Sequence, residues 1–267
     1  MNVPDSVPIL LTIEEGIAEI RLNNPPLNLV TEMMTRSLRE AVDTVAERPD
    51  VRVVLLTASG ERAFCAGSDM KEFPVLQPVA LERKLFPEHD MLRRLATMPM
   101  PTIAVMEGPA LGGGFELAIC CDLRVGSSRC TVGFPEVGIG GLASIATQRL
   151  PRLIGLARAK EMILLRHVLN AEQAHQIGLL TAATPANEAR TRALEMAHSI
   201  IESGPRAIRL AKQLLDLSYD VPIDAGLGRA LDAAEQVFES DDLLEGAAAF
   251  FERRKPRFGG PPTRRGD

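Results

Sequence analysis

Apolar residues recur along this chain with two different periods, and the pattern predicts strands and helices in turn. Short apolar runs at residues 9–13 and 17–22 flank a Glu-Glu-Gly turn, which predicts a β-hairpin. From residue 31 to 47 the apolar positions have helical spacing, with Thr31 as the candidate N-cap. The uninterrupted apolar run at 51–57 predicts a strand that is buried on both faces.

The alternation of strand and helix returns further along the chain. Residues 102–107 are predicted to form a strand, 115–121 a helix and 122–126 another strand. Before them, residues 74–87 are polar and broken by prolines, and we expect this segment to be mobile or variable because it has no clear period. A helix is predicted over 89–98. Such alternation indicates an α/β architecture.

The last third of the chain has a different pattern, in which helices alone are predicted from about residue 186 onward. The predicted helices span residues 188–202, 205–217, 223–240 and 243–253. Gly-Pro and Val-Pro pairs separate them. We therefore divide the chain into a core over residues 1–200 and a C-terminal helical region over residues 201–267.

Composition narrows the class of protein. The chain has 267 residues, of which 46% are hydrophobic and 24% charged, as in an ordinary globular protein with one substantial core. Its formal net charge of −5 argues against broad electrostatic capture of nucleic acid. The start of the sequence lacks a basic stretch followed by an apolar one, and no apolar run has membrane-spanning length. We expect a soluble, cytoplasmic protein without a membrane partner.

The cysteines and glycines do not indicate a metal or a nucleotide cofactor. Cys65, Cys120, Cys121 and Cys130 have no common zinc spacing, so we expect buried free thiols and no metal site. The glycine stretches lack the Gly-Lys-Ser/Thr ending of a phosphate-binding loop, and no well-placed Gly-x-Gly-x-x-Gly opens a helix after a strand. Neither ATP nor NAD is implied.

Two short stretches carry the candidate chemistry. Residues 63–72 read Ala-Phe-Cys-Ala-Gly-Ser-Asp-Met-Lys-Glu, and residues 108–116 read Gly-Pro-Ala-Leu-Gly-Gly-Gly-Phe-Glu. In the second stretch three glycines lie between a predicted strand and a predicted helix. The first N–H groups of a helix have no intrahelical partner, and small residues allow a ligand oxygen to approach them. Two such donors that converge make an oxyanion hole.

The order of landmarks along the chain resembles that of the crotonase (enoyl-CoA hydratase/isomerase) family. Besides the two stretches above, the landmarks are Phe134-Pro135-Glu136, Thr147-Gln148-Arg149-Leu150-Pro151-Arg152 and a tail from Glu245-Gly246 to Arg253-Arg254-Lys255-Pro256. The resemblance covers nearly the whole chain. It implies a spiral of ββα repeats, followed by C-terminal helices that pack across subunits into trimers, often paired into hexamers.

The resemblance also implies an activity, because Glu116 and Glu136 occupy the positions of the two glutamates of hydratases. Two carboxylates in one pocket can hold a water, and one can take its proton while the other delivers a proton to carbon. The N–H groups of Ser68 and Gly113 would bind the thioester oxygen as an enolate forms. Family members that only isomerise or decarboxylate commonly lack one glutamate, so the pair favours enoyl-CoA hydration. Without the resemblance, Glu116 would be a charge that stabilises a helix dipole, and Glu136 a loop carboxylate in a salt bridge.

Acyl-CoA would be the substrate, with no further cofactor. The residues implied to line the CoA path are Ala66, Gly67, Ser68, Asp69, Met70, Lys71 and Gly113. Lys71 is a candidate phosphate contact, although an exposed lysine is usually a solvated surface residue. Ser68 lacks a Gly-x-Ser-x-Gly elbow and a motif-linked histidine, so we do not expect a nucleophile there. The four histidines, among them His89, have the pattern of ordinary surface residues.

One loop departs from the family pattern. Residues 140–146 read Gly-Gly-Leu-Ala-Ser-Ile-Ala where hydratases usually carry a Pro-Gly-Ala-Gly-Gly-like stretch, and the loop is about one residue shorter. It borders the catalytic water in the family. Two alternatives therefore stay open: another crotonase activity, such as isomerase, CoA-thioester hydrolase or lyase, and a non-catalytic RNA-binding relative. Candidate residues for the acyl pocket are Met33, Met70, Leu76, Phe86 and Leu142.

Overall fold

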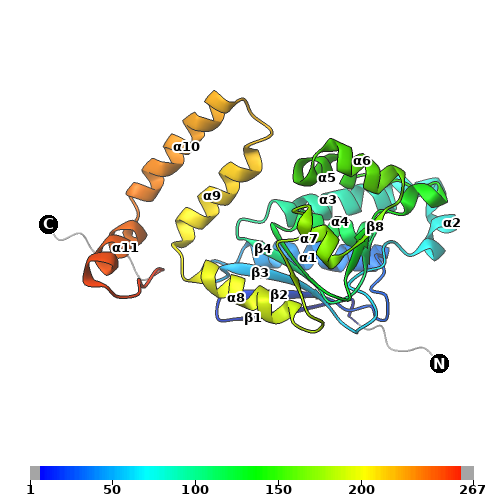
Figure 1. Cartoon of the computed structure of the whole chain (residues 1–267), viewed down its shortest axis with the longest axis horizontal. Helices are drawn as coiled ribbons and strands as arrows, with labels where there is room; N and C mark the ends of the chain where they lie inside the picture. The colour runs from blue at the N-terminus through cyan, green and yellow to red at the C-terminus, as the bar shows by residue number, and fades with distance from the viewer. Residues whose placement is uncertain (1–6, 260–267) are drawn as a thin grey trace.

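The structure is a computed structural model that describes residues 7–259, and its centre is a six-stranded sheet in the order β1-β2-β3-β4-β6-β9. The first two strands form the predicted antiparallel hairpin, and every later pair is parallel. The strands are β1 (Ile9–Glu14), β2 (Ile17–Leu22), β3 (Val53–Ala58), β4 (Thr102–Met106), β6 (Leu123–Ser127) and β9 (Ala182–Thr184). Figure 1 shows this sheet within the body of the molecule.

Both faces of the sheet are covered, which explains the uninterrupted apolar runs. In β3, Val54 and Leu56 pack into the main core with helix α1 (Glu32–Ala46), whereas Val53 and Leu55 pack against α8 (Ala189–Ile201). A strand that alternates its side chains between two buried faces needs apolar residues at every position. Thr31 caps α1 as predicted, because its side-chain oxygen accepts a hydrogen bond from Met34 N at 3.1 Å.

Short elements complete the body, and among them the sequence pattern predicted only the helix over residues 115–121. A second sheet has the order β5-β7-β8. Its strands are β5 (Ala110–Leu111), β7 (Thr131–Gly133) and β8 (Val168–Asn170), and the helices around it are α4 (Gly113–Cys120), α5 (Ala146–Ile154), α6 (Leu156–Leu164) and α7 (Ala171–Gln176), with a 3-10 turn at Glu136–Ile139. Strands of two or three residues are too short for periodicity to identify them.

The segment before α3 (Phe86–Ala96) is helical, although its sequence has no clear period. Residues 74–87 form successive helical turns that lead directly into α3. These turns are η1 (Met70–Glu72), α2 (Phe73–Leu76), η2 (Gln77–Val79) and the π-helical η3 (Leu81–Leu85). The prolines begin new turns at positions where no backbone donor is needed, so they do not break the helical path.

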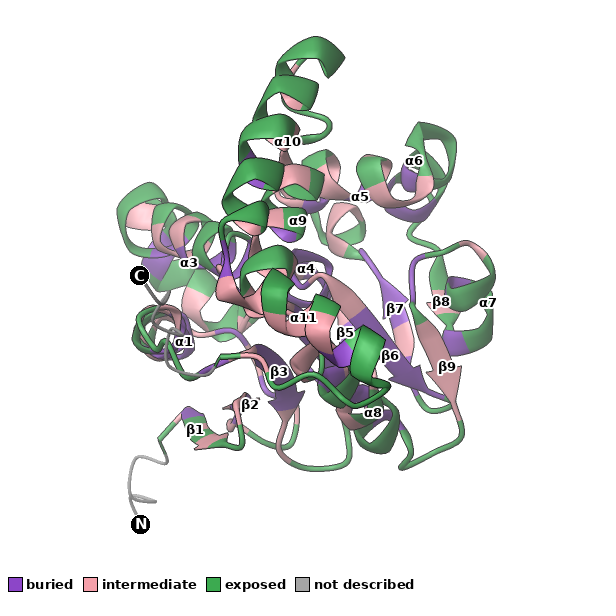
Figure 2. Cartoon of the chain, turned by 90° about the vertical axis from the view of Figure 1, so that its left-hand side faces the viewer, coloured by how far each residue is buried: buried purple, intermediate pink, exposed green. Residues whose placement is uncertain are grey.

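Three helices after α8 extend away from the body. They are α9 (Pro205–Leu217), α10 (Ile223–Phe238) and α11 (Asp241–Glu252), and Figure 1 shows them as an arm beside the sheet. Most of their surface is exposed (Figure 2), and the one buried side chain of α9 is Lys212, whose ammonium pairs with Asp122. Within residues 7–259, no helix has both the length and the apolar character that crossing a membrane requires.

Candidate active site

Two loops at the ends of β3 and β4 lie side by side and place two backbone donors together. Leu111 N donates to Cys65 O at 3.0 Å, and Phe64 N donates to Pro109 O at 3.0 Å. This pairing brings Ser68 next to the first residue of α4, so that a Cβ on Gly113 would lie 3.9 Å from Ser68 N. Within residues 7–259, neither Ser68 N nor Gly113 N donates a hydrogen bond. The two amides are therefore available to a ligand oxygen.

The glycine triplet is explained by close approaches at its first and third positions. Gly112 has φ +55°, and a Cβ there would lie 2.7 Å from Glu136 Oε1. A Cβ on Gly114 would collide with the Cys65 carbonyl oxygen. Side chains at these positions would thus push apart the two loops or displace the carboxylate of Glu136.

Glu116 lies on the first turn of α4 and is only 8% exposed. Its Oε1 accepts a hydrogen bond from Ala146 N at 3.0 Å, at the start of α5. Burial raises the pKa of this carboxyl to about 7, and the nearby Glu136 carboxylate acts in the same direction. A group that titrates near neutral pH can both accept and release a proton.

Glu136 comes from the 3-10 turn that follows β7, and it is half-buried. Burial raises the pKa of its carboxyl as well. Its Oε2 is buried and has no hydrogen-bond partner among the described residues. Neither Glu116 nor Glu136 forms a salt bridge within residues 7–259, so the interpretation of Glu136 as one half of an ion pair does not fit the structure. Such an unfilled buried acceptor is suited to a water or a substrate group.

The unusual 140–146 loop keeps its link to the site. Its last residue, Ala146, donates its amide hydrogen to Glu116. Ala143 and Ala146 are both buried. His89 of α3 reaches this loop, because its Nε2 lies 2.7 Å from Ser144 Oγ. We expected His89 to be an ordinary surface residue, and the sequence gives no signal for a contact between residues 55 positions apart.

The residues predicted to line the CoA path and the acyl pocket differ in how far they are buried. Of the residues predicted to line the CoA path, those at 66–71 follow Cys65 on one loop, whereas Gly113 begins α4. On the loop, Asp69 accepts a hydrogen bond from Lys71 N at 3.0 Å. Of the candidate acyl-pocket residues, Leu76 is buried, whereas Met33, Met70, Phe86 and Leu142 are each at least half exposed. All four cysteines are buried free thiols as predicted, and burial raises the pKa of each to about 12.

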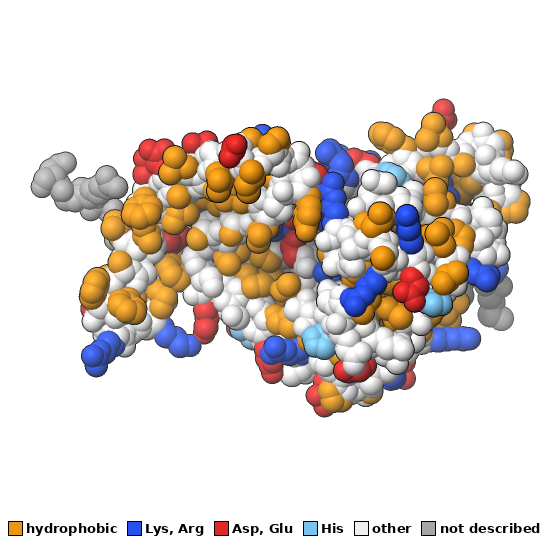
Figure 3. Space-filling view, turned by 45° about the horizontal axis from the view of Figure 1, so that its top comes forward, with side chains coloured by type: hydrophobic (Ala, Val, Ile, Leu, Met, Phe, Trp, Pro, Cys, Tyr) orange, Lys and Arg blue, Asp and Glu red, His pale blue; other side chains and the backbone are white. Residues whose placement is uncertain are grey.

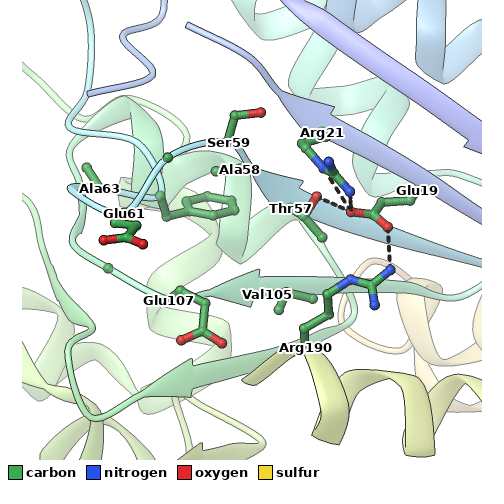
Figure 4. Close-up of a pocket in the computed structure, with 13 residues that line it drawn as sticks. Glu19, Arg21, Thr57, Ala58, Ser59, Glu61, Ala63, Val105, Glu107 and Arg190 are labelled. Atoms are coloured by element: carbon green, nitrogen blue, oxygen red, sulfur yellow. Dashed lines mark hydrogen bonds and ion pairs between the residues drawn. The ribbon is translucent and has the colours of Figure 1, made fainter. Parts of the chain in front are cut away.

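A second set of charged side chains surrounds a cavity of about 300 Å³ between β2, β3, β4 and α8 (Figure 4). It contains none of the predicted site residues. Here Glu19 accepts hydrogen bonds from Arg21 at 2.7 Å, Thr57 at 2.8 Å and Arg190 at 2.9 Å. Because the carboxylate of Glu19 is saturated by its own neighbours, we assign the chemistry to the Glu116 site instead.

The body is a mostly parallel sheet wound with helices, in which two free loop amides lie beside one buried and one half-buried carboxyl. In comparison with known proteins, the sequence signature described as enoyl-CoA hydratase/isomerase matches residues 12–261. The chain belongs to this family.

Two relatives and one solved structure illustrate the similarity. Mouse enoyl-CoA hydratase domain-containing protein 2, a mitochondrial protein, is 38% identical over 92% of this chain and 85% of its own length. Crotonyl-CoA hydratase from Syntrophomonas wolfei is 35% identical over 94% of this chain and 97% of its own. The crystal structure of an enoyl-CoA hydratase from Bacillus anthracis has a TM-score of 0.91 at 33% identity, over 95% of this chain and 100% of that one.

Proposed function

We propose that this protein is an enoyl-CoA hydratase, which adds water across the 2,3 double bond of a 2-enoyl-CoA thioester. The observation that carries the proposal is the meeting of two free amides, Ser68 N and Gly113 N, with the buried carboxyl of Glu116 and the half-buried carboxyl of Glu136. The names of the relatives support it, since one of them is a crotonyl-CoA hydratase.

The two amides would bind the thioester oxygen. When water adds to C3, negative charge moves onto this oxygen as an enolate forms, and both N–H groups would donate to it. Removing one donor of this kind typically raises the barrier by about 3 kcal/mol. The donors are held by the pairing of the two loops rather than by flexible side chains, so the site needs little rearrangement during the reaction.

The two glutamates would handle the protons. One carboxylate takes a proton from the attacking water, and the other carboxyl delivers a proton to C2. This requires one group to be charged and the other protonated at working pH, and the repulsion between the two carboxylates disfavours the state in which both are ionised. We therefore propose a bell-shaped dependence of kcat on pH, because activity is lost when both groups are protonated at low pH or both ionised at high pH.

The CoA moiety would lie along residues 66–71, which continue from the amide of Ser68 to the molecular surface. Met70 is 56% exposed and Lys71 is also exposed, so both are accessible to a ligand from outside. Lys71 is the candidate contact for a CoA phosphate. We include no other cofactor in the reaction, since hydration of an enoyl thioester needs only acid–base catalysis and an oxyanion hole.

We also propose that the chain assembles into a homotrimer, or a hexamer of two trimers, through its arm. Large apolar side chains are exposed along α9–α11, and Figure 3 shows hydrophobic side chains gathered over that end of the molecule. They include Leu215, Tyr219, Ile223, Leu227, Leu231, Phe238, Phe250 and Phe251. An apolar surface of this extent is typical of a protein–protein interface. Light scattering on the intact chain tests this, and a monomer at micromolar concentration would contradict it.

The activity is tested by the loss of enoyl-thioester absorbance with crotonyl-CoA and with longer 2-enoyl-CoA substrates. We expect turnover by the wild type and a loss of about a hundredfold or more in Glu116→Gln and in Glu136→Gln. Loss in only one of the two variants would favour another crotonase-family activity. Absence of turnover on any acyl-CoA, together with salt-sensitive retention of RNA, would favour the non-catalytic alternative.

A further inference from the structure

The loop before α5, residues 142–146, has few contacts that hold it in place. Among the described residues, its hydrogen-bond partners outside the loop and α5 are Glu116 and His89. Ala146 N donates to Glu116 Oε1 at 3.0 Å, and Ser144 Oγ lies 2.7 Å from His89 Nε2. The first bond holds a proposed catalytic carboxyl, and the second joins the loop to α3.

Packing alone leaves this loop room to move. Its buried side chains are the small ones of Ala143 and Ala146. Ile145 and His89 instead line a cavity of about 490 Å³ between α3, α4 and α5. A void on one side of a loop offers no packing contacts, so the small side chains hold the loop weakly. The hydrogen bond to His89 therefore matters for where the loop lies.

Helix α3 is a firm anchor for that bond. Met91, Leu92 and Leu95 of α3 are buried in the core, and the helix packs on both α1 and α4. His89 lies on the exposed side of α3, near its start. A side chain on a packed helix can thus fix a loop that is itself loosely packed.

The position of the loop affects the charge of Glu116. The amide of Ala146 favours the carboxylate and lowers the pKa of Glu116, whereas burial and the charges of Glu136 and Glu88 raise it. If the loop moved away, the carboxyl would lose its hydrogen bond and its fixed orientation, and its pKa would rise further. Proton transfer requires that orientation.

From this arrangement we propose that His89 is a positioning residue, which acts through Ser144 to keep Ala146 N on the carboxyl of Glu116. His89 itself does not contact the reacting atoms. The inference rests on the proposed hydratase function and adds a residue to its site. Ser144 belongs to the loop that departs from the family pattern, which explains why the resemblance did not predict this contact.

The first test substitutes each partner of the bond and measures kcat and KM with crotonyl-CoA. In His89→Ala and in Ser144→Ala we expect kcat to fall by about tenfold, because the carboxyl of Glu116 is no longer held in one position. KM should stay unchanged, since the proposed CoA path at residues 66–71 lies on another loop. The alkaline limb of the dependence of kcat on pH should move to higher pH, because the pKa of Glu116 rises.

Two further variants separate positioning from a general loss of structure. His89→Gln keeps a side-chain nitrogen in the place of Nε2, and it should restore most of kcat. Because the two residues act through one bond, the double variant His89→Ala with Ser144→Ala should be no slower than the slower single variant. Losses that multiply in the double variant, or a His89→Gln variant as slow as His89→Ala, would overturn the inference.

His167 provides a matched control. It is also an exposed histidine that is hydrogen bonded to a side chain, with Nδ1 3.1 Å from Glu161 Oε1, but it does not contact the 142–146 loop. His167→Ala should leave kcat, KM and the pH profile unchanged. The inference is wrong if His167→Ala loses as much kcat as His89→Ala, or if His89→Ala keeps the kcat of the wild type.

Failure of the proposed function has a different signature, which is absence of turnover by the wild type with every acyl-CoA, crotonyl-CoA included. In that case the pKa of Glu116 decides, measured from the carboxyl ¹³C resonance that is lost in Glu116→Gln. A higher pKa in His89→Ala and Ser144→Ala, but not in His167→Ala, would support the positioning role. The same pKa in all of these proteins would overturn it.

Discussion

Glu19 and Glu116 are buried to almost the same extent, yet the pKa values of their carboxyls are shifted in opposite directions. Glu19 is 7% exposed and Glu116 is 8% exposed. Burial alone would raise the pKa of Glu19, but hydrogen bonds from Arg190, Arg21 and Thr57 more than offset it and lower the pKa. Glu116 has a single amide hydrogen bond and a neighbouring carboxylate, and burial raises its pKa to about 7.

This comparison shows that the number of partners, and not burial, separates a structural carboxylate from a candidate catalytic one. Glu19 is fixed as an anion by two guanidinium groups and a hydroxyl, as Figure 4 shows. Glu116 retains the freedom to change its protonation state near neutral pH. A buried polar group with few hydrogen-bond partners lowers the stability of the fold, and such a group is therefore a candidate for a catalytic or binding role.

The largest expected effect is on kcat, which substitution of Glu116 should lower far more than substitution of Glu19. Glu116→Gln should lower kcat for crotonyl-CoA by about a hundredfold or more, since Gln keeps the shape but cannot transfer a proton. Glu19→Gln should leave kcat within about threefold of the wild type, because that carboxylate lies outside the proposed site and shares no partner with Glu116 or Glu136. Steady-state kinetics on both purified variants checks this. A comparable loss in Glu19→Gln would show that the second cavity takes part in the reaction.

The next effect is on the free energy of unfolding at pH 7, which substitution of Glu19, and not of Glu116, should lower. Glu19→Gln leaves Arg21 and Arg190 without their shared anion, and we expect the free energy of unfolding at pH 7 to fall by about 2 kcal/mol. Because the folded pKa of Glu19 is below its ordinary value, this contribution is present above pH 4.5 and is lost as the pH falls through the folded pKa. Urea unfolding at fixed protein concentration should therefore show the deficit at pH 7 and a smaller one at acid pH.

Glu116→Gln should instead stabilise the protein at alkaline pH. The folded pKa of about 7 lies above the ordinary value of 4.5, so the wild type loses stability as the pH rises between these values. We expect the variant to gain about 3 kcal/mol over the wild type at pH 8, while Gln still accepts the hydrogen bond from Ala146 N. The gain should vanish below pH 4.5. A variant that is less stable than the wild type at pH 8 would contradict the raised pKa.

The sequence alone predicted the parts of the molecule that local pattern determines. The apolar strand β3 and the capped helix α1 follow from residue types within single elements. Glu116 and Glu136 were predicted as catalytic residues through the resemblance to a family, and the sequence did not predict the residues that contact them. Glu19 illustrates the limit, because Arg190 is 171 positions away and no local pattern joins them. The helical turns of residues 74–87 were missed for a different reason: a proline that starts a helical turn looks the same in sequence as one that ends it.

The smallest effect isolates one of the three partners of Glu19. Thr57 is 6% exposed, and its hydroxyl donates to Glu19 Oε1 at 2.8 Å without carrying a charge. Thr57→Val keeps the volume and removes this donor, so we expect the free energy of unfolding at pH 7 to fall by about 1 kcal/mol. The pKa of Glu19 should rise toward its ordinary value, since one of the bonds that favour the anion is gone. Urea unfolding at pH 7 and pH 4 measures both changes. If Thr57→Val cost as much as Glu19→Gln, the hydroxyl and not the arginines would hold the anion, and the contrast with Glu116 would rest on one neutral hydrogen bond.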